Sequence, residues 1–353
     1  MFGTKKINYW LGVCLLVVSG FVDSKPVINS VEGILKHGQA IQVKGAGFGA
    51  TGRELPNLFD DFESGDLGNN LNTGLWSTDS GNGSEDPIFD NFFAFSGSQS
   101  GYGDMSSGGD SAAFIRGVNS SRIYVSLMFR YKVTSGSPST TKGVRVHADD
   151  GPNVYTSYPG VFVQDYLTSN RNTIGANDDG GTFSDYGPGN IEQNRWVRLE
   201  YYIEMSSPAG ASNGIVNSWV DMKEDSSWAG VNRAAGVNDV YQLVMMPFYF
   251  GNGGAGKVWY DDVYISRSKA RLELCDSGNW SDCSGRSIQV PSSWSGSVIE
   301  AKLNLAGLDG ANNLYLYVVG DDGAVSDSFL LGSAPIASGV APLAPSNFQI
   351  STQ

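Results

Sequence analysis

Short stretches of alternating apolar and polar residues run along most of the chain, separated by glycine, asparagine, aspartate and serine. In the middle they read RIYVSLMFRYKV, KGVRVHAD, GVFVQDY, RWVRLEYYIEM, NSWVDMKED and YQLVMMPFYFG. Each has the length of a strand and is rich in β-branched and aromatic residues. Few runs have the spacing of an amphipathic helix. The pattern therefore predicts an all-β protein, with an antiparallel β-sandwich over residues 57–266.

The two ends of the chain have a strand style of their own. Residues 26–49 contain two alternating stretches that are joined by a turn at His37-Gly38. Two strands cannot bury a core alone, so their partners must come from elsewhere. Segments of the same style follow residue 267, namely ARLELCD, RSIQVP, VIEAKLNL and LYLYVVGDDGAVSDSF. We expect residues 25–56 and 267–333 to form one small β-domain that is interrupted by the sandwich, with the strand at 40–45 pairing beyond residue 271.

Composition and charge narrow the classes of function. The chain has 353 residues with 46 glycines and 12% aromatic residues, which fits one large or two moderate β-domains. Its formal net charge is -13, and no basic patch opposes it. Such a surface repels phosphate backbones and anionic lipid, so we expect no nucleic-acid partner. An acidic surface serves solubility or calcium coordination.

Both termini carry segments outside the predicted domains. Residues 1–24 contain Lys5 and Lys6, an apolar run and then small residues, the three parts of an export signal. The run is shorter than the roughly 20 apolar residues of a spanning helix, so we expect a secreted or cell-surface protein with no membrane insertion in its mature form. Residues 334–353 are rich in Pro, Ala and Ser and read as a linker.

Removal of the predicted signal leaves two cysteines, Cys275 and Cys283, eight positions apart. An exported chain with two cysteines at hairpin distance most simply pairs them. The alternative is a metal site, which lacks a third and fourth soft ligand nearby. We predict a disulfide that closes the loop carrying Trp280.

Several of these segments resemble known families. FDDFESG, IYVSLMFRYKV and VWYDDVYIS resemble the concanavalin A-like lectin/glucanase jelly roll, a fold of lectins, glycosidases and polysaccharide lyases. SVEGILKHGQAIQVKGAGFG, SIQVPSSW and LYLYVVGDDGAVSDSF resemble strands of an immunoglobulin-like IPT/TIG domain, with a long interruption after the second strand. The tail segment APSNFQI resembles the first strand of a fibronectin type III module. Together they imply a jelly roll inserted in a discontinuous Ig-like IPT/TIG sandwich.

A calcium ion is the one candidate cofactor. Acidic residues occur on the first and last strands of the predicted sandwich, which lie side by side in such folds and gather hard oxygen ligands. The alternative is that these carboxylates face solvent. We expect no organic cofactor, because no phosphate-cradling glycine-rich loop precedes a helix. The candidate metal ligands are Asp60, Asp61, Glu63, Asp261 and Asp262.

Candidates for catalysis converge on one strand. The chain has two histidines, His37 and His147, and His37 belongs to the small domain. In KGVRVHAD, Arg145 and His147 alternate with valines and so share a face. Gln164 and Tyr166 alternate likewise in GVFVQDY. The resemblance implies a lyase set, in which Arg and Gln or Asn neutralise a uronate carboxylate while His and Tyr move the proton. The lyase motifs Arg-x-Glu-x-Arg and Gln-x-His are absent, and any half-exposed strand alternates in this way.

Other hydrolytic arrangements find less support. Glu200 and Glu204 stand four residues apart on one strand, about 13 Å at the usual rise, which is too far for a glycosidase pair. Glycan binding requires only aromatic rings that stack on sugar faces and polar side chains that hydrogen-bond the sugar hydroxyls. The candidate binding residues are Tyr155, Tyr158, Tyr166, Tyr186, Trp228 and Tyr249.

We therefore predict a secreted carbohydrate-binding protein. The alternatives are a polysaccharide lyase acting on a uronate-containing glycan, and a structural or adhesive extracellular module. The sequence favours binding over catalysis because His147 is the one histidine available to the sandwich.

Overall fold

The protein is seen here in a computed structural model. It describes residues 25–49, 55–71, 74–79, 86–105, 113–136, 144–147, 162–168, 171–178, 181–233, 239–247, 254–308 and 310–332. The regular elements within these ranges are strands and one single-turn 3-10 helix, η1 (Trp280–Asp282). The all-β class predicted from the alternating pattern is confirmed. The predicted export signal and the tail at 334–353 lie outside the described residues.

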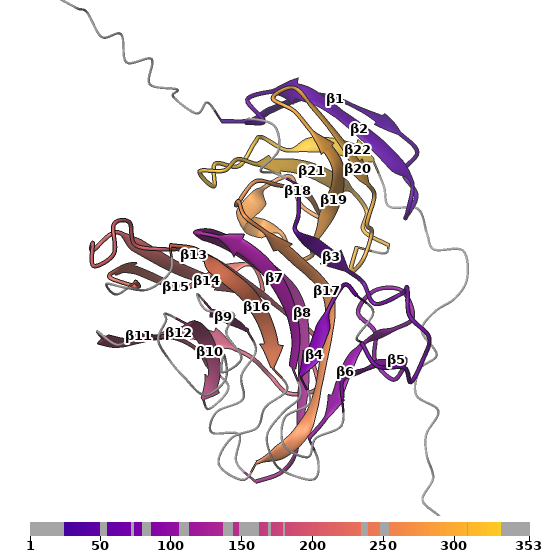
Figure 1. Ribbon diagram of the computed structural model, residues 1–353. Helices are drawn as coiled ribbons and strands as arrows, with labels where there is room; N and C mark the ends of the chain where they lie inside the picture. Colours follow the sequence, from indigo (N-terminus) through magenta and orange to yellow (C-terminus); the bar gives the residue numbers. More distant parts are fainter. Residues whose placement is uncertain are drawn as a thin grey trace, which may run out of the picture.

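The first and last parts of the described chain share one sheet, here called the terminal sheet. Its order is β1 (Val27–Gly33), β2 (Ala40–Ala46), β20 (Val298–Lys302), β19 (Arg286–Trp294), β18 (Arg271–Cys275), β21 (Leu314–Val319) and β22 (Phe329–Gly332). β2 pairs antiparallel with β20, from Ala40 opposite Lys302 to Lys44 opposite Val298. Figure 1 shows indigo β1 and β2 beside the orange and yellow strands of the C-terminal part. The expected pairing between the two ends is thus present.

Alternating apolar residues of the terminal sheet meet in a core of their own. Ile41 and Val43 of β2 pack with Leu272 of β18, Ile299 of β20 and Leu316 of β21, and all five are at most 2% exposed. Since β1 and β2 supply only part of this core, the N-terminal segment folds with the C-terminal one. The IPT/TIG resemblance of these strands stays a prediction.

Two further sheets form a sandwich from the residues between these ends. The sheet called here the β8 sheet has the order β15 (Lys223–Gly230), β14 (Gly214–Val220), β13 (Val197–Glu204), β8 (Arg122–Ser135), β17 (Ala255–Ser266), β6 (Ser100–Asp104) and β5 (Ile88–Asp90), with β3 (Leu58–Asp60) also on β17. The β10 sheet has the order β12 (Gly181–Asn190), β11 (Arg171–Asp178), β10 (Phe162–Thr168), β9 (Arg145–His147), β16 (Tyr241–Pro247), β7 (Ala113–Ser120) and β4 (Ser77–Asp79). Their strand pairs are antiparallel, as the sequence predicts.

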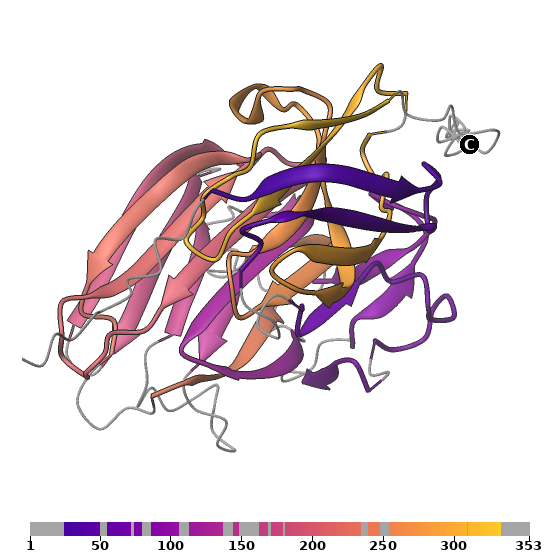
Figure 2. The ribbon, with the colours of Figure 1, turned by 90° about the horizontal axis from the view of Figure 1, so that it is seen from above.

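The sandwich core follows from period-two alternation. Val125 and Leu127 of β8 are buried in the same cluster as Val146 of β9 and Val244 of β16. The alternate residues of β8 face away from that core, where Tyr124 packs with Ile288 of the terminal sheet. The terminal sheet therefore covers the outer face of the β8 sheet, and Figure 2 shows it lying over those strands. The outer face of the β10 sheet lies on the opposite side of the sandwich.

No helix in the described ranges is long and apolar enough to cross a membrane.

Candidate functional site

The predicted catalytic positions are brought together by the register of the β10 sheet. β9 lies between β10 and β16, and Arg145 stands directly opposite Gln164. His147 stands opposite Phe162 on the same pair of strands. Residues opposite each other, and residues two apart on one strand, share a face. Arg145, His147 and Gln164 therefore occupy one face, and the core residue Val146 between them occupies the other.

The same face extends to two tyrosine positions. Tyr166, two residues beyond Gln164, stands opposite Thr173 of β11. Thr173 in turn stands opposite Tyr186 of β12. The two tyrosines are two strands apart, which is about 10 Å at the usual strand spacing. Five predicted positions thus line up across four neighbouring strands, on the face turned away from the sandwich core.

Among the predicted catalytic and glycan-binding residues, Arg145 and Trp228 are those whose side-chain surroundings the structure describes. Arg145 is buried, with 8% of its surface exposed. The strand positions of His147, Gln164, Tyr166 and Tyr186 are described, but not their side chains. Trp228 of β15 is half-buried and packs against the sandwich core. Tyr155, Tyr158 and Tyr249 lie outside the described residues.

The predicted metal ligands lie where the first strand of the sandwich meets its last. β3 pairs with β17, with Asp60 opposite Val263. Asp60 is buried, and its carboxylate accepts hydrogen bonds from the Trp76 indole (2.6 Å) and the Phe62 backbone N–H (2.9 Å). Burial raises the pKa of Asp60, although the Trp76 hydrogen bond opposes the shift. This carboxylate is therefore held by protein donors.

Asp261 and Asp262 lie at an irregularity of β17, where its register with β8 shifts and Asp262 takes a left-handed φ of 44°. Asp261 accepts hydrogen bonds from the backbone N–H groups of Phe95 (2.7 Å) and Ser96 (3.2 Å). Burial, followed by the neighbouring Asp262 carboxylate, raises the pKa of Asp261 well above its usual value. The β17 irregularity thus places a buried acid and a half-buried acid side by side.

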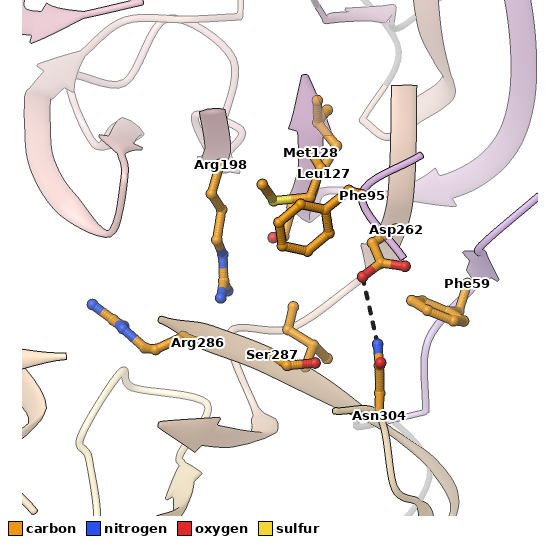
Figure 3. Close-up of a pocket in the computed structure, with 11 residues that line it drawn as sticks. Phe59, Phe95, Leu127, Met128, Arg198, Asp262, Arg286, Ser287 and Asn304 are labelled. Carbon is orange, nitrogen blue, oxygen red and sulfur yellow. Dashed lines mark hydrogen bonds between the residues drawn. The ribbon is translucent and has the colours of Figure 1, made fainter. Parts of the chain in front are cut away.

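Asp262 faces the terminal sheet, where its carboxylate accepts a long hydrogen bond of 3.5 Å from the Asn304 amide (Figure 3). It also accepts one of 2.7 Å from the Ser96 hydroxyl. Burial raises the pKa of Asp262 to about 6. A cation would stabilise the ionised forms of two neighbouring acids whose pKa values are raised in this way.

No three of the five predicted carboxylate ligands, all of which the structure describes, have oxygen atoms close enough together to bind one metal ion. Glu63 accepts hydrogen bonds from the Ser98 and Gln99 backbone N–H groups, both 2.7 Å. Among the described residues, the one group of three His, Cys, Asp or Glu side chains with ligand atoms within 4.8 Å is Cys275, Asp276 and Cys283. Its two cysteines are joined in the predicted disulfide, with Cα atoms 5.8 Å apart. A calcium ion near Asp262 would therefore need backbone carbonyls among its ligands.

Sequence reasoning missed a buried ionic cluster between the β8 sheet and the terminal sheet. Arg198 of β13 donates to both carboxylate oxygens of Glu273 on β18, at 3.2 and 3.1 Å, and to Glu200 at 3.2 Å. Arg271 donates to Glu273 and lies 3.6 Å from Glu200. The signal in the sequence is the tripeptide Arg-Leu-Glu, which occurs within both apolar strands. The four charged side chains join the sandwich to the terminal sheet.

Comparison with known proteins finds likeness in structure only. No protein-family model matches the sequence, and no curated protein matches it. The solved structures that resemble it include the cellulose-induced protein Cip1, at 16% identity and a TM-score of 0.44, over 60% of this chain and 98% of that one. An endo-β-1,4-glucuronan lyase from Trichoderma reesei has 14% identity and a TM-score of 0.44, over 60% and 96%. The alginate lyase Aly36B has 11% identity and a TM-score of 0.45, over 60% and 97%. Likenesses of this size establish neither the family nor the activity of this chain.

Proposed function

We propose that this protein is exported and binds a polysaccharide on the outer face of the β10 sheet. The observation that supports the proposal is the register of β9 to β12, in which Arg145, Gln164, Tyr166 and Tyr186 are positions of that one face. Tyrosine rings stack on the apolar C–H faces of sugar rings, and Arg and Gln hydrogen-bond their hydroxyl groups. A row of such positions across four strands suits an extended chain of sugars.

A second candidate function is a polysaccharide lyase on the same face, and the pairing of Arg145 with Gln164 favours it. In such a reaction a base removes the proton next to the uronate carboxylate, the bond from the next carbon to the glycosidic oxygen breaks as a double bond forms, and the departing oxygen takes up a proton, here from Tyr166. A cation and an amide would stabilise the charge that develops on the carboxylate. His147, two residue pairs along from Gln164 and on the same face, would be the base.

Replacement of His147 by Ala separates the two functions. We expect His147→Ala to keep nearly full glycan affinity and the wild type to form no unsaturated product that absorbs near 235 nm. His37→Ala is the matched control, because His37 is the other histidine and its ring accepts a hydrogen bond from the Leu305 backbone N–H in the small domain. Sustained product formation by wild type and His37→Ala, lost in His147→Ala, would replace binding by lyase activity as the function.

A glycan array separates the third candidate function, a structural or adhesive module, from the other two. Folded protein that binds no glycan on such an array would support that reading against both others.

A further inference from the structure

The ionic cluster at the domain interface carries more positive than negative charge. Its members are Arg198 and Glu200 of β13, Arg271 and Glu273 of β18, and Arg286 of β19, three guanidinium groups against two carboxylates. Arg198, Arg271 and both glutamates pair with one another. Arg286 forms no ion pair with a carboxylate in the described part of the chain, so it holds the unmatched charge.

Arg286 is held in place largely by uncharged groups. Its Nη2 donates to the Met222 carbonyl at 3.0 Å, and its guanidinium lies 3.8 Å from the centre of the Trp280 ring. Its Nε is buried without a hydrogen-bond partner. Burial lowers the pKa of Arg286, although the Glu273 and Glu200 carboxylates oppose the shift. An anion beside a half-buried cation of this kind stabilises it.

Next to Arg286 lies a cavity of about 530 Å³ between the two domains, which falls in the size range of small-molecule sites. Its lining includes Trp196, a half-buried ring that meets Phe95 edge-on at 6.2 Å. The ionisable side chains that line it are Arg195, Arg198, Lys223, Arg286, Asp221 and Asp282, four cations and two carboxylates. In a chain of net charge -13 this is a cationic hollow.

The other charges around the cavity are already matched or open to water. Arg195 pairs with Asp221 at 2.8 Å, and Arg198 pairs with Glu273. Lys223 and Asp282 are exposed at the edge. Figure 3 shows Arg286 and Arg198 on facing elements, with the Arg286 guanidinium directed away from Asp262. Arg286 is therefore the cation available to an incoming anion.

We propose that this cavity is a binding site for a uronate, a sugar that carries a carboxylate. The carboxylate binds Arg286, and the sugar ring packs against Trp196. Charge selects the carboxylate, while the aromatic wall selects a ring over a simple organic acid. The site lies across the sandwich from the β10 face, so it does not depend on polysaccharide binding there.

Calorimetry with methyl β-D-glucuronide and methyl β-D-glucoside tests the site, because these probes differ in the carboxylate. We expect the glucuronide to bind at least tenfold more tightly than the glucoside, and its affinity to fall as salt is added. Arg286→Gln should weaken glucuronide binding at least tenfold. Lys44→Gln is the control: Lys44 is an exposed cation of the terminal sheet, paired with Glu32, and its loss should change nothing.

A second pair of variants covers the case in which Arg286→Gln does not fold. Ser281 is exposed at the cavity, so Ser281→Glu should weaken glucuronide binding severalfold and Ser281→Lys should not. His147→Ala should leave glucuronide binding unchanged, which distinguishes this site from the β10 face. The proposal is overturned if the wild type binds both probes equally or neither, if Ser281→Glu or a folded Arg286→Gln binds like the wild type, or if His147→Ala abolishes binding.

Discussion

At the scale of single residues, the protein buries carboxylates in two contrasting ways. Asp262 lies beside another acid, and burial raises its pKa to about 6. Burial would likewise raise the pKa of Glu273, but the guanidinium groups of Arg198 and Arg271 outweigh it and lower the pKa to about 2. The first arrangement favours a cation from solution, and the second supplies cations from the chain itself.

Calcium should stabilise the protein through the first arrangement. Saturating calcium is expected to raise the melting temperature of chelator-treated protein, because a ligand that binds only the folded state stabilises it. The shift should shrink in Asp262→Asn, whose amide oxygen can still accept the Ser96 hydrogen bond. The shift should persist in Asp66→Asn, since Asp66 is an exposed acid three residues after the predicted ligand Glu63. Identical melting curves with and without calcium would remove the metal from the account.

The second arrangement, at Glu273, makes the free energy of unfolding depend on pH. Since the pKa of Glu273 is lower in the folded than in the unfolded state, its contribution is present above about pH 4.5 and is lost as pH falls towards 2. Glu273→Gln should cost about 3–5 kcal/mol at neutral pH, because two buried arginines lose one of their two carboxylate partners. It should also flatten the dependence on pH in this window.

Denaturant unfolding at pH 7 and pH 3 measures both effects. Glu32→Gln is the control, because Glu32 pairs with Lys44 on the surface, and its loss should cost less than about 1 kcal/mol. Equal losses for the two variants at pH 7 would contradict a stabilising role for the buried cluster.

At the scale of elements, the Cys275–Cys283 disulfide closes a loop that contains η1. Trp280 of this short helix packs edge-on against Tyr317 at 5.1 Å and lies under Arg286. The N-cap of η1 is Asn279, whose side chain accepts a hydrogen bond from the Ser281 backbone N–H. The loop thus carries one wall of the interface between the domains.

Reduction of this disulfide should cost about 2–3 kcal/mol, because a closed loop of this length restricts the unfolded chain. The wild type should have a mass about 2 Da below its reduced form, the mass of two hydrogens, and alkylation under native conditions should label no thiol. The double variant Cys275→Ser, Cys283→Ser should match reduced wild type in stability. Two thiols labelled in the native protein would contradict the bond.

At the scale of the whole molecule, alternation predicts strands and faces but not which strands meet. We expect the strand at 40–45 to pair with one beyond residue 271 because two strands alone cannot bury a core. The structure agrees, since β2 pairs with β20. The faces of Arg145 and His147 also follow from alternation alone. Their register against Gln164 does not, since alternation fixes which residues share a face but not which residues of two strands stand opposite each other.

The contact between the β8 sheet and the terminal sheet could not be predicted from the sequence, for a related reason. A charged tripeptide inside an apolar strand does not name its partner, and Arg198 meets Glu273 across 75 positions of chain. Trp196 lines the cavity beside this contact. A search for charged residues in otherwise apolar strands would have marked Arg198 and Arg271, but not the cavity beside them.

The most direct test of the account is the affinity of the folded protein for soluble polysaccharides, compared between wild type and Tyr166→Ala. We expect the wild type to bind a polysaccharide. The variant should bind it about threefold to tenfold more weakly, because a stacked aromatic ring contributes about 0.5–1.5 kcal/mol. Wild-type protein that binds no polysaccharide, or a Tyr166→Ala variant with unchanged affinity, would contradict a binding role for the β10 face.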